Sequence, residues 1–402
     1  MNPWLAVVGI GEEGLAGLAP AARALVEAAD VVVGGVRHLE MVPPSGAERL
    51  RWERPLDRTI ETIARLRGRH VTVLASGDPL WYGVGVALAR RFARDEMTIV
   101  PHPGAFSLAA ARLGWPVADC VTITLQGRPL DTLRLHLTPA RRILALSADG
   151  GTPRVVAQLL TKLGWGPSRL VVFAHLGGAQ ESRVEEEARS WGDRPVADLN
   201  TIAIECRGGP EARPLSLFAG LPDDAFEHDG QLTKREVRAT TLAALAPLPG
   251  ETLWDVGAGC GSIAIEWLRA GAGRSAIVIE RIPARAAVIA RNANSLGVPG
   301  LRIITGTAPD VLEGLPMPDA IFAGGGITAP GLLPLLWARL RPGGRLVANV
   351  VTAEGEARLL DWYMTHGGAL ARIAISRAEP FGRHRLWRSL APVTQLAVTK
   401  PE

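Results

Sequence analysis

Short apolar segments alternate with amphipathic segments along this chain of 402 residues, in two separate series. A helix between consecutive strands places those strands parallel in one sheet, so the alternation predicts an α/β protein with mostly parallel pairing. Between the series, residues 211–230 are rich in glycine, proline and acidic residues, which indicates a linker. At about 150 residues per domain, the length suits two or three domains. We therefore expect one domain at 1–210, a linker at 211–230 and a second domain at 231–402.

The apolar periodicity places the individual elements. In the first series, strands are expected at 4–8, 31–34, 71–75, 97–100, 121–125, 142–146, 169–174 and 200–205, and helices at 20–29, 57–67, 83–94, 104–113 and 152–163. In the second series, strands are expected at 251–255, 275–280, 301–305, 319–322, 344–349, 370–375 and 394–399, and helices at 261–270, 283–295, 328–340 and 354–366. Thr233 and Glu236 have the spacing of a capping box, which predicts a further helix from there to about Leu245.

Composition excludes several classes. The net charge of +4 is too small to indicate a nucleic-acid partner. The three cysteines lie far apart without a CxxC pair, so neither a disulfide framework nor a metal site is expected. The first residues lack a basic segment before their apolar run, and no stretch of 18 residues is both apolar and uncharged. We therefore expect a cytoplasmic protein with no membrane partner.

A glycine-rich turn follows the first strand of the second series and opens a helix. It comprises Asp255, Val256, Gly257, Ala258, Gly259, Cys260 and Gly261. Its glycines allow a sharp turn and close approach of the backbone to a ligand. Glu280 ends the next strand, where a carboxylate can accept both hydroxyls of a ribose.

Two ligands compete for this turn, and a purely structural turn is a third possibility. A dinucleotide site requires glycine at the position of Ser262, and Asp255 would lie poorly beside a pyrophosphate. S-adenosylmethionine carries a sulfonium and an ammonium group and no phosphate, so it suits the acidic residue better. The pattern favours a methyltransferase over a dinucleotide-binding protein.

Two later loops complete this candidate site. Ala308 lies in Gly306–Asp310 after the third strand, where an adenine would be enclosed. Gly324 and Gly325 end the fourth strand and leave room for a large, flat substrate, although a flexible turn would have the same composition.

The second series resembles the decarboxylating precorrin methyltransferases, which are class I enzymes of corrin-ring synthesis. The resemblance rests on LTKREVR at 232–238, WDVGAGCGSIAIEW at 254–267, GTAP at 306–309 and PDAIFAGGG at 318–326. It implies a Rossmann-like fold with a seven-stranded sheet. It also implies that S-adenosylmethionine contacts Thr233, Gly257 to Gly261, Glu280 and Ala308. Cys260 stands where these relatives often have serine.

In the first series, three consecutive strand ends carry polar, glycine-rich loops. Residues 75–83 contain Gly77 and Asp78, residues 101–107 end at Ser107, and residues 126–129 contain Arg128. Because such loops gather at one edge of a parallel sheet, we expect them to line one cleft. An earlier turn, Gly9-Ile10-Gly11-Glu12-Glu13-Gly14, matches a nucleotide-binding string, but its two carboxylates would repel phosphate.

The first series resembles the tetrapyrrole methylases, the class III methyltransferases. VVGIG at 7–11, ADVVVGGVRHL at 29–39, LASGDPLWYG at 74–83 and Gly104–Ser107 carry this resemblance. It implies cofactor contacts at Gly9, Gly11, Gly77, Asp78 and Ser107, and a substrate contact at Arg128. Relatives usually have histidine at the position of Gln126.

Two methyltransferase folds on one chain suggest one shared substrate. The fusion resembles the decarboxylating precorrin-6Y C5,15-methyltransferases of cobalamin (vitamin B12) biosynthesis. That resemblance implies methylation of C5 by the first half, and methylation of C15 with decarboxylation of the C12 acetate by the second, yielding precorrin-8X. It also implies S-adenosylmethionine as cofactor and a homo-oligomer. The alternative is a methyltransferase of protein or RNA with a scaffolding first domain.

A tetrapyrrole carries many carboxylates, so its anchors should be basic. Arg383 and Arg385 belong to a basic cluster near the C-terminus, with Arg377 and Arg388, and guanidinium groups pair with carboxylates in a bidentate manner. A solvated charge run is the other interpretation. Arg383, Arg385, Arg128, Gly324 and Gly325 are the predicted substrate contacts.

Overall fold

The computed structural model describes residues 3–402, so the first two residues of the predicted first domain lie outside it. The chain forms two compact units. The first extends to Leu130 and continues over His136–Arg213, and the second comprises Asp131–Leu135 and Pro214–Glu402. The second unit thus begins inside the segment that was predicted to be a linker. That segment is folded, because its Gly220 and Leu221 N–H groups donate to the buried Glu266 carboxylate at 2.6 and 2.9 Å.

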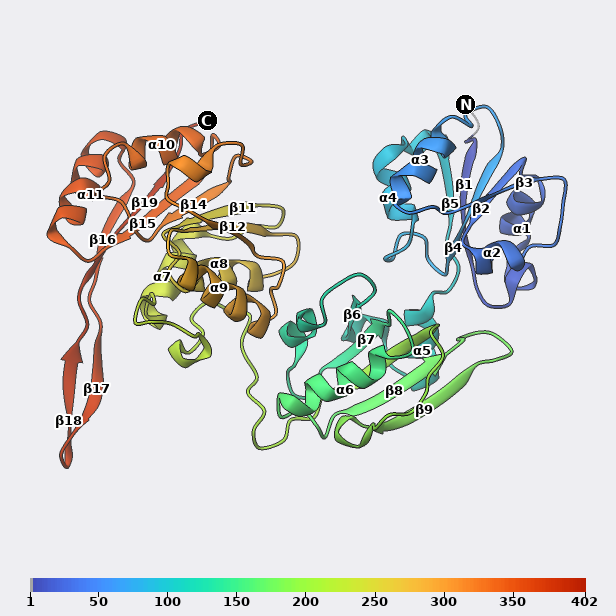
Figure 1. The fold of residues 1–402 in the computed structure, drawn as a ribbon, viewed down its shortest axis with the longest axis horizontal. Helices are drawn as coiled ribbons and strands as arrows, with labels where there is room; N and C mark the ends of the chain where they lie inside the picture. Colours follow the sequence, from blue (N-terminus) through green and yellow to red (C-terminus); the bar gives the residue numbers. More distant parts are fainter. Residues whose placement is uncertain (1–2) are drawn as a thin grey trace. The chain divides into compact units, whose positions relative to one another are not determined.

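The first unit opens with a fully parallel sheet in the order β3-β2-β4-β1-β5. Its strands are β1 (Leu5–Ile10), β2 (Val31–Gly34), β3 (Glu48–Arg51), β4 (Val71–Ser76) and β5 (Met97–Val100). Its helices are α1 (Pro20–Glu27), α2 (Val36–Glu40), α3 (Leu56–Ala64) and α4 (Gly85–Arg91). Figure 1 shows α1 and α2 on one face of the sheet and α3 and α4 on the other. This double cover explains why the central strands are continuous apolar runs.

A second sheet of the first unit has the order β6-β7-β10-β8-β9. It comprises β6 (Cys120–Thr124), β7 (Arg142–Leu146), β8 (Arg169–Ala174), β9 (Ser182–Glu187) and β10 (Asn200–Glu205), with helices α5 (Ala105–Leu113) and α6 (Thr152–Lys162). Only β6 and β7 pair in parallel, so the expectation of mostly parallel pairing is wrong for this sheet. The loop that joins β8 to β9 is too short for a crossover helix, and such strands must pair antiparallel.

The second unit contains the predicted seven-stranded sheet, in the order β13-β12-β11-β14-β15-β19-β16. Its strands are β11 (Thr252–Val256), β12 (Ser275–Glu280), β13 (Arg302–Thr305), β14 (Ala320–Ala323), β15 (Arg345–Val350), β16 (Ala369–Ile373) and β19 (Val393–Thr399). The antiparallel pairs are β15–β19 and β19–β16, and the other neighbours pair in parallel. The α/β class with this sheet is confirmed.

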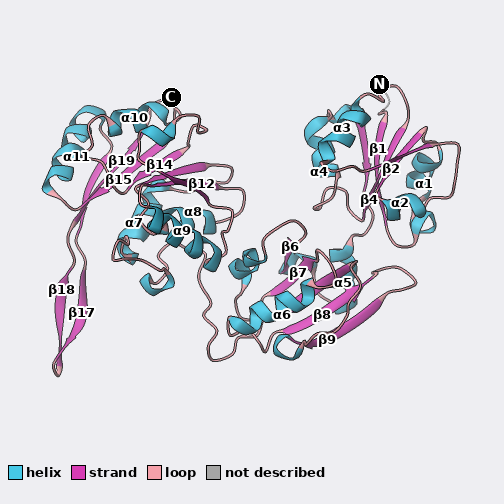
Figure 2. Ribbon diagram, viewed as in Figure 1, coloured by secondary structure: helices cyan, strands magenta, loops and turns pink. Residues whose placement is uncertain are grey.

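The helices of the second unit cover both faces of its sheet. They are α7 (Arg235–Leu245), α8 (Ser262–Arg269), α9 (Pro283–Ser295), α10 (Leu332–Arg339) and α11 (Ala353–His366). Figure 2 shows α7, α8 and α9 on one face and α10 and α11 on the other. Among residues 3–402, no helix combines the length and apolarity needed to cross a membrane.

The sequence patterns missed one hairpin, formed by β17 (Ser376–Phe381) and β18 (His384–Ser389). It projects from the sheet (Figure 1), and every residue of β18 is exposed. Arg383 and Arg385 lie in its turn and in β18, respectively. At its base, Arg377 pairs with Asp223 at 3.0 Å and with Glu236 at 2.6 Å. The hydrogen bond from Arg377 and its charge lower the pKa of Glu236, despite the opposing effect of desolvation.

The predicted capping box is absent. Helix α7 begins at Arg235, and the N-cap residue Lys234 makes no side-chain cap. The Glu236 carboxylate, which was expected to cap, is instead paired with Arg377. Because the N-cap is Lys234 and not Thr233, Glu236 lies at the second helical position, one residue short of the position that a capping box requires.

Arg238 anchors the start of α7 from inside the core. Its side chain is fully buried, and its Nε donates to Glu266 at 2.6 Å. Its Nη1 donates to the Thr233 carbonyl oxygen at 2.5 Å, and its Nη2 donates to the Leu221 carbonyl oxygen. This arginine therefore connects α7, α8 and the chain segment that precedes α7.

Candidate active sites

The glycine turn after β11 abuts the glycine loop after β14. Gly257 has a φ of +73°, and a Cβ built on it would lie 2.9 Å from the Gly325 Cα and N atoms. Side chains cannot approach so closely, so both backbones must be bare here. The two loops together form the carboxyl edge of the sheet, where ligands of open α/β sheets bind.

Glu280 ends β12 beside this turn. Its Oε2 accepts from the Gly259 N–H at 2.9 Å, and its Oε1 accepts from the Ile282 N–H at 3.0 Å. The carboxylate lines a cavity of about 390 Å³, together with Gly306, Thr307, Ala308 and the two glycine loops. Each carboxylate oxygen can accept two hydrogen bonds, so both keep capacity for a ligand donor.

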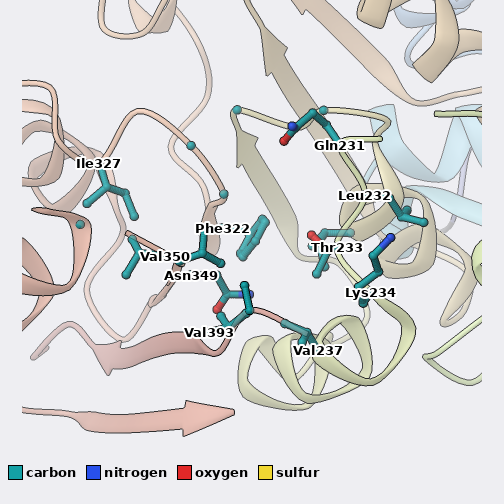
Figure 3. A pocket seen from close by; sticks show the side chains of 18 of the residues that line it. Gln231, Leu232, Thr233, Lys234, Val237, Phe322, Ile327, Asn349, Val350 and Val393 are labelled. Atoms are coloured by element: carbon teal, nitrogen blue, oxygen red, sulfur yellow. The ribbon is translucent and has the colours of Figure 1, made fainter. Parts of the chain in front are cut away.

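A second cavity of about 500 Å³ adjoins the first. Both are lined by Gly257, Gly259 and Gly324–Gly326. Figure 3 shows one wall formed by Gln231, Leu232, Thr233, Lys234 and Val237, and a facing wall that includes Phe322, Ile327, Asn349 and Val350. Ile375, Leu390 and Val393 add further apolar surface. Such a cavity suits a large, mostly apolar ligand held by few polar groups.

Asn349 is one of the polar side chains on the wall that faces Thr233. Its Nδ2 donates to the Thr241 Oγ1 at 2.8 Å, and its Oδ1 accepts from the Gln395 Nε2 at 2.9 Å. Thr241 and Gln395 are themselves buried. The network holds the Asn349 amide in one orientation toward the cavity. No spacing in the sequence pointed to this residue.

Asp255 lies beneath the turn and lines neither cavity. Only 1% of the residue is exposed, and its Oδ2 accepts from the Ala264 N–H in the first turn of α8. Its Oδ1 has no partner among the described residues. Burial, with a smaller contribution from Glu280, raises the pKa of Asp255 to about 7.

This pKa predicts a pH dependence of stability. Asp255 is protonated in the folded protein between its ordinary pKa of 3.8 and about 7, whereas the unfolded chain has already released that proton. The free energy of unfolding should therefore fall as pH rises through this window, by up to about 1.4 kcal/mol per pH unit. Urea unfolding of the wild type and Asp255→Asn at several pH values checks this. In Asp255→Asn, this fall in the free energy of unfolding with rising pH should be absent. If the pH profiles of the two proteins ran parallel, Asp255 would not be the group responsible.

In the first unit, a cavity of about 200 Å³ lies between the two sheets. The loops after β1, β4 and β5 contribute Gly11, Glu12, Ser76, Gly77, Asp78, Trp81 and 102–107, and the second sheet contributes Leu146, Phe173 and Asn200. Gly77 has a φ of +56°, and a Cβ on it would lie 2.4 Å from the Gly104 Cα atom. Close backbone packing therefore shapes this cavity too.

Of the two carboxylates in the acidic turn after β1, Glu12 lines this cavity and is ion-paired. Glu12 pairs with Arg37 and accepts from the His175 Nδ1 at 3.0 Å. His38 lies 2.9 Å from the Ser76 Oγ through its Nε2. Burial and the adjacent Arg37 lower the pKa of His38 to about 4, so His38 is neutral at neutral pH.

The loop after β6 does not line the cavity of the first unit, contrary to the expectation of one shared cleft. The reason is that β6 is an edge strand of the second sheet, outside β7, β10 and β8, whose residues line the cavity. The Arg128 guanidinium instead lies 5.3 Å from the centre of the Tyr82 ring. Tyr82 and Trp81 are each 41% exposed, and Trp81 also lines the cavity. Aromatic surface and a cation thus stand together at its rim.

The predicted site residues fall into three groups. Thr233, Gly257, Ala258, Gly259, Cys260, Glu280, Ala308, Gly324 and Gly325 line the two cavities of the second unit. Gly11, Gly77, Asp78 and Ser107 line the cavity of the first. Gly9, Arg128, Asp255, Gly261, Arg383 and Arg385 line none of the three cavities. Gly9 lies beneath the turn, since a Cβ on it would meet the Gly77 carbonyl oxygen at 1.9 Å.

Two family models match this chain. The model of tetrapyrrole (corrin/porphyrin) methylases matches residues 5–190, and the model of a precorrin methyltransferase domain matches residues 224–400.

Curated relatives match the whole chain or part of it. A precorrin-6Y C(5,15)-methyltransferase (decarboxylating) from Sinorhizobium is 50% identical over 401 residues, which is 100% of this chain and 97% of the relative. A cobalt-precorrin-7 C(5)-methyltransferase from Salmonella typhimurium is 31% identical, over 49% of this chain and 92% of the relative. A cobalt-precorrin-6B C(15)-methyltransferase (decarboxylating) from the same organism is 31% identical, over 42% of this chain and 90% of the relative.

Proposed function

The chain belongs to the family of decarboxylating precorrin-6Y C(5,15)-methyltransferases, and we propose that its two units divide the reactions of that family between them. The protein is a methyltransferase of cobalamin biosynthesis. The first unit would methylate C5, and the second would methylate C15 and decarboxylate the C12 acetate, giving precorrin-8X. Two separate Salmonella proteins that carry the C(5) and C(15) names, each matching less than half of this chain, support this division. A match to tetrapyrrole methylases over 5–190 does not favour the alternative of a protein or RNA methyltransferase with a scaffolding first domain.

The pair of adjoining cavities in the second unit carries the proposal. The smaller one offers what S-adenosylmethionine requires: a fixed Glu280 carboxylate for ribose hydroxyls, a side-chain-free glycine turn and Ala308 for the adenine. The larger one offers apolar walls for a flat tetrapyrrole. Bound in the smaller cavity, S-adenosylmethionine would supply an electrophilic methyl group. The glycine wall common to both cavities would let that methyl group reach the acceptor carbon without a side chain in between.

The residues of the larger cavity would favour both reactions by positioning and by excluding water. Methyl transfer between two bound partners gains mainly from correct alignment. Val350, Ile375 and Val393 would strip water from a ring carboxylate, whose loss as CO2 sends its electron pair into the conjugated ring. Asn349, held by Thr241 and Gln395, would orient the ring by one fixed amide.

In the first unit, we propose that the donor occupies the cavity beside Gly77 and Asp78, and that the tetrapyrrole lies over the rim. Trp81 and Tyr82 would stack on the ring. Arg128, already stacked on Tyr82, would pair with a peripheral carboxylate.

Two substitutions in the full chain test the division of labour. Incubated with precorrin-6Y and S-adenosylmethionine, wild type should add two methyl groups and release one CO2, as read by mass spectrometry. Glu280→Gln removes a charged acceptor, which weakens a hydrogen bond by about 1.5–3 kcal/mol, so at limiting S-adenosylmethionine C15 methylation should fall by about 10- to 150-fold while C5 methylation is kept. Gly77→Ala should leave C15 methylation and CO2 release intact. Loss of both methylations in both variants would reject the division.

Location and assembly are part of the same proposal. The reaction suits a cytoplasmic enzyme with a tetrapyrrole partner and no nucleic acid. The exposed Phe381, Leu386 and Trp387 of the hairpin suit a homo-oligomer, because two strands alone are marginally stable in water. Light scattering of wild type and a Phe381→Ser, Trp387→Ser variant measures the oligomeric state. An unchanged mass would exclude this hairpin from assembly.

A further inference from the structure

Only three of the 44 lysine and arginine residues are lysines, and a structural role explains the position of two of them. Lys162 lies exposed in the last turn of α6, where a cation favours the helix end. The Lys400 Nζ donates to the Trp337 and Leu340 carbonyl oxygens at 2.7 Å each, at the end of α10. No structural role of this kind explains the position of the third, Lys234.

Lys234 faces the larger cavity of the second unit. It is half-buried at the N-cap of α7, and among the described residues its ammonium group has no hydrogen bond or ion pair. It is the one charged side chain among the described residues that line this cavity. Figure 3 shows it beside Thr233, on the wall that faces Phe322 and Asn349.

Two nearby cations, Arg238 and Arg377, are already engaged. Arg238 is fully buried and bonded to Glu266, and Arg377 is paired with Asp223 and Glu236. Arg238 also holds the Thr233 carbonyl oxygen, which fixes the main chain beside Lys234. The cavity therefore has one ammonium group on a rigid support.

A lysine differs from an arginine in that it can release its proton during a reaction. Nearly all the other cationic side chains of this protein are arginines. A lysine on this wall therefore indicates that a group able to release a proton is needed here. Loss of CO2 from an acetate leaves a carbon that must gain a proton to become a methyl group. Cys260 also lines this cavity, but burial raises the pKa of its thiol, which makes it a poor proton donor.

We propose that Lys234 is the acid that protonates this carbon, an inference that rests on the proposed decarboxylation in the second unit. The bond between the acetate methylene carbon and its carboxylate breaks, and the electron pair passes into the conjugated ring as CO2 leaves. Until the carbon is protonated, CO2 can add back to it. The pair is trapped when it forms a C–H bond with a proton from the Lys234 Nζ, so net CO2 release depends on this acid. The amine that remains regains a proton from water.

Lys234→Arg in the full chain is the discriminating variant, because it keeps the positive charge but cannot give up a proton. CO2 release from precorrin-6Y labelled in the ring acetates, methyl transfer and substrate affinity are measured on the same samples. We expect CO2 release to slow by on the order of 100-fold or more, with methyl transfer and affinity kept within about threefold. Lys162→Arg is the matched control and should behave as wild type.

Four results would overturn the proposal. The first is CO2 release at the wild-type rate in Lys234→Arg, and the second is an equal loss of substrate binding and of both reactions in Lys234→Arg and Lys234→Met. The third is a Lys234→Cys variant that does not recover CO2 release after aminoethylation. The fourth is wild-type product formed in D2O that carries no deuterium in its new methyl group. The aminoethylated variant restores an ammonium group at the same place, so its recovery would support the role even if the arginine variant folds poorly. If wild type itself releases no CO2, the proposed function fails and the role of Lys234 fails with it, whereas a wild type that releases CO2 confines any failure to the role of Lys234.

Discussion

Replacing Arg238 by methionine will lower the free energy of unfolding of the second unit by about 3–5 kcal/mol. The substitution keeps the length of the side chain but leaves the Glu266 carboxylate buried without its cation. Two backbone N–H groups, of Gly220 and Leu221, still donate to that carboxylate, but they do not neutralise it. The loss should be confined to this unit, because Arg238 and all its partners belong to it.

Hydrogen exchange of the full chain, followed peptide by peptide, separates the two units. Peptides from β11, β12 and β14 should lose protection, and peptides from β1 and β4 should keep it. Arg388→Met is the matched control, since its ion pair with Glu379 is exposed and should contribute no more than about 1 kcal/mol. The double variant Arg238→Met, Glu266→Met should recover much of the stability. If Arg238→Met changed protection no more than Arg388→Met, the buried pair would have no special weight.

Gly257→Ala will disable the second unit and leave the first at work. The new Cβ would lie 2.9 Å from the Gly325 backbone, so the turn and the glycine loop must separate. Their separation displaces the wall common to both cavities. A displacement of about 1 Å between reacting groups lowers rates by on the order of 100-fold, which is the fall expected for C15 methylation and CO2 release.

Gly250→Ala provides a matched control for this substitution. Gly250 has a φ of +85°, so alanine meets the same backbone strain, but its Cβ would face open space. That variant should lose about 1–2 kcal/mol of stability and keep its activity. C5 methylation serves as an internal standard in both variants. Equal loss of C15 methylation in both would attribute the effect to backbone strain and not to the crowded wall.

Buried elements were predictable from the sequence because their apolar residues follow a regular period. β11, β12 and β14 are nearly continuous apolar runs, as sheets covered on both faces require. The strands that were missed, β3, β9, β17 and β18, are polar and mostly exposed. Main-chain pairing forms such edge strands and hairpins, and it leaves no hydrophobic period to detect.

The site was predictable where chemistry demands a motif. Gly257 directly follows β11, and Glu280 is the last residue of β12, so both could be located from the predicted strands. Asn349 reaches the same cavity through tertiary folding alone, and Lys234 lies in a recognised run, LTKREVR, in which only Thr233 was predicted to contact a ligand. Conversely, Arg383 and Arg385 have the right charge for a substrate anchor, but they lie on the projecting hairpin. Their charge did not indicate that this segment forms a hairpin that projects from the sheet.

The bare glycine wall between the two cavities of the second unit has a thermodynamic consequence. A molecule in either cavity touches main chain that also bounds the other, so any shift of this wall on binding in one cavity would change the affinity of the other. Linkage is reciprocal: the factor by which one occupant changes the affinity of the other is the same in both directions. A demethylated donor that stays bound would therefore change the affinity for the methylated tetrapyrrole by that factor. Release of the two products would then be coupled.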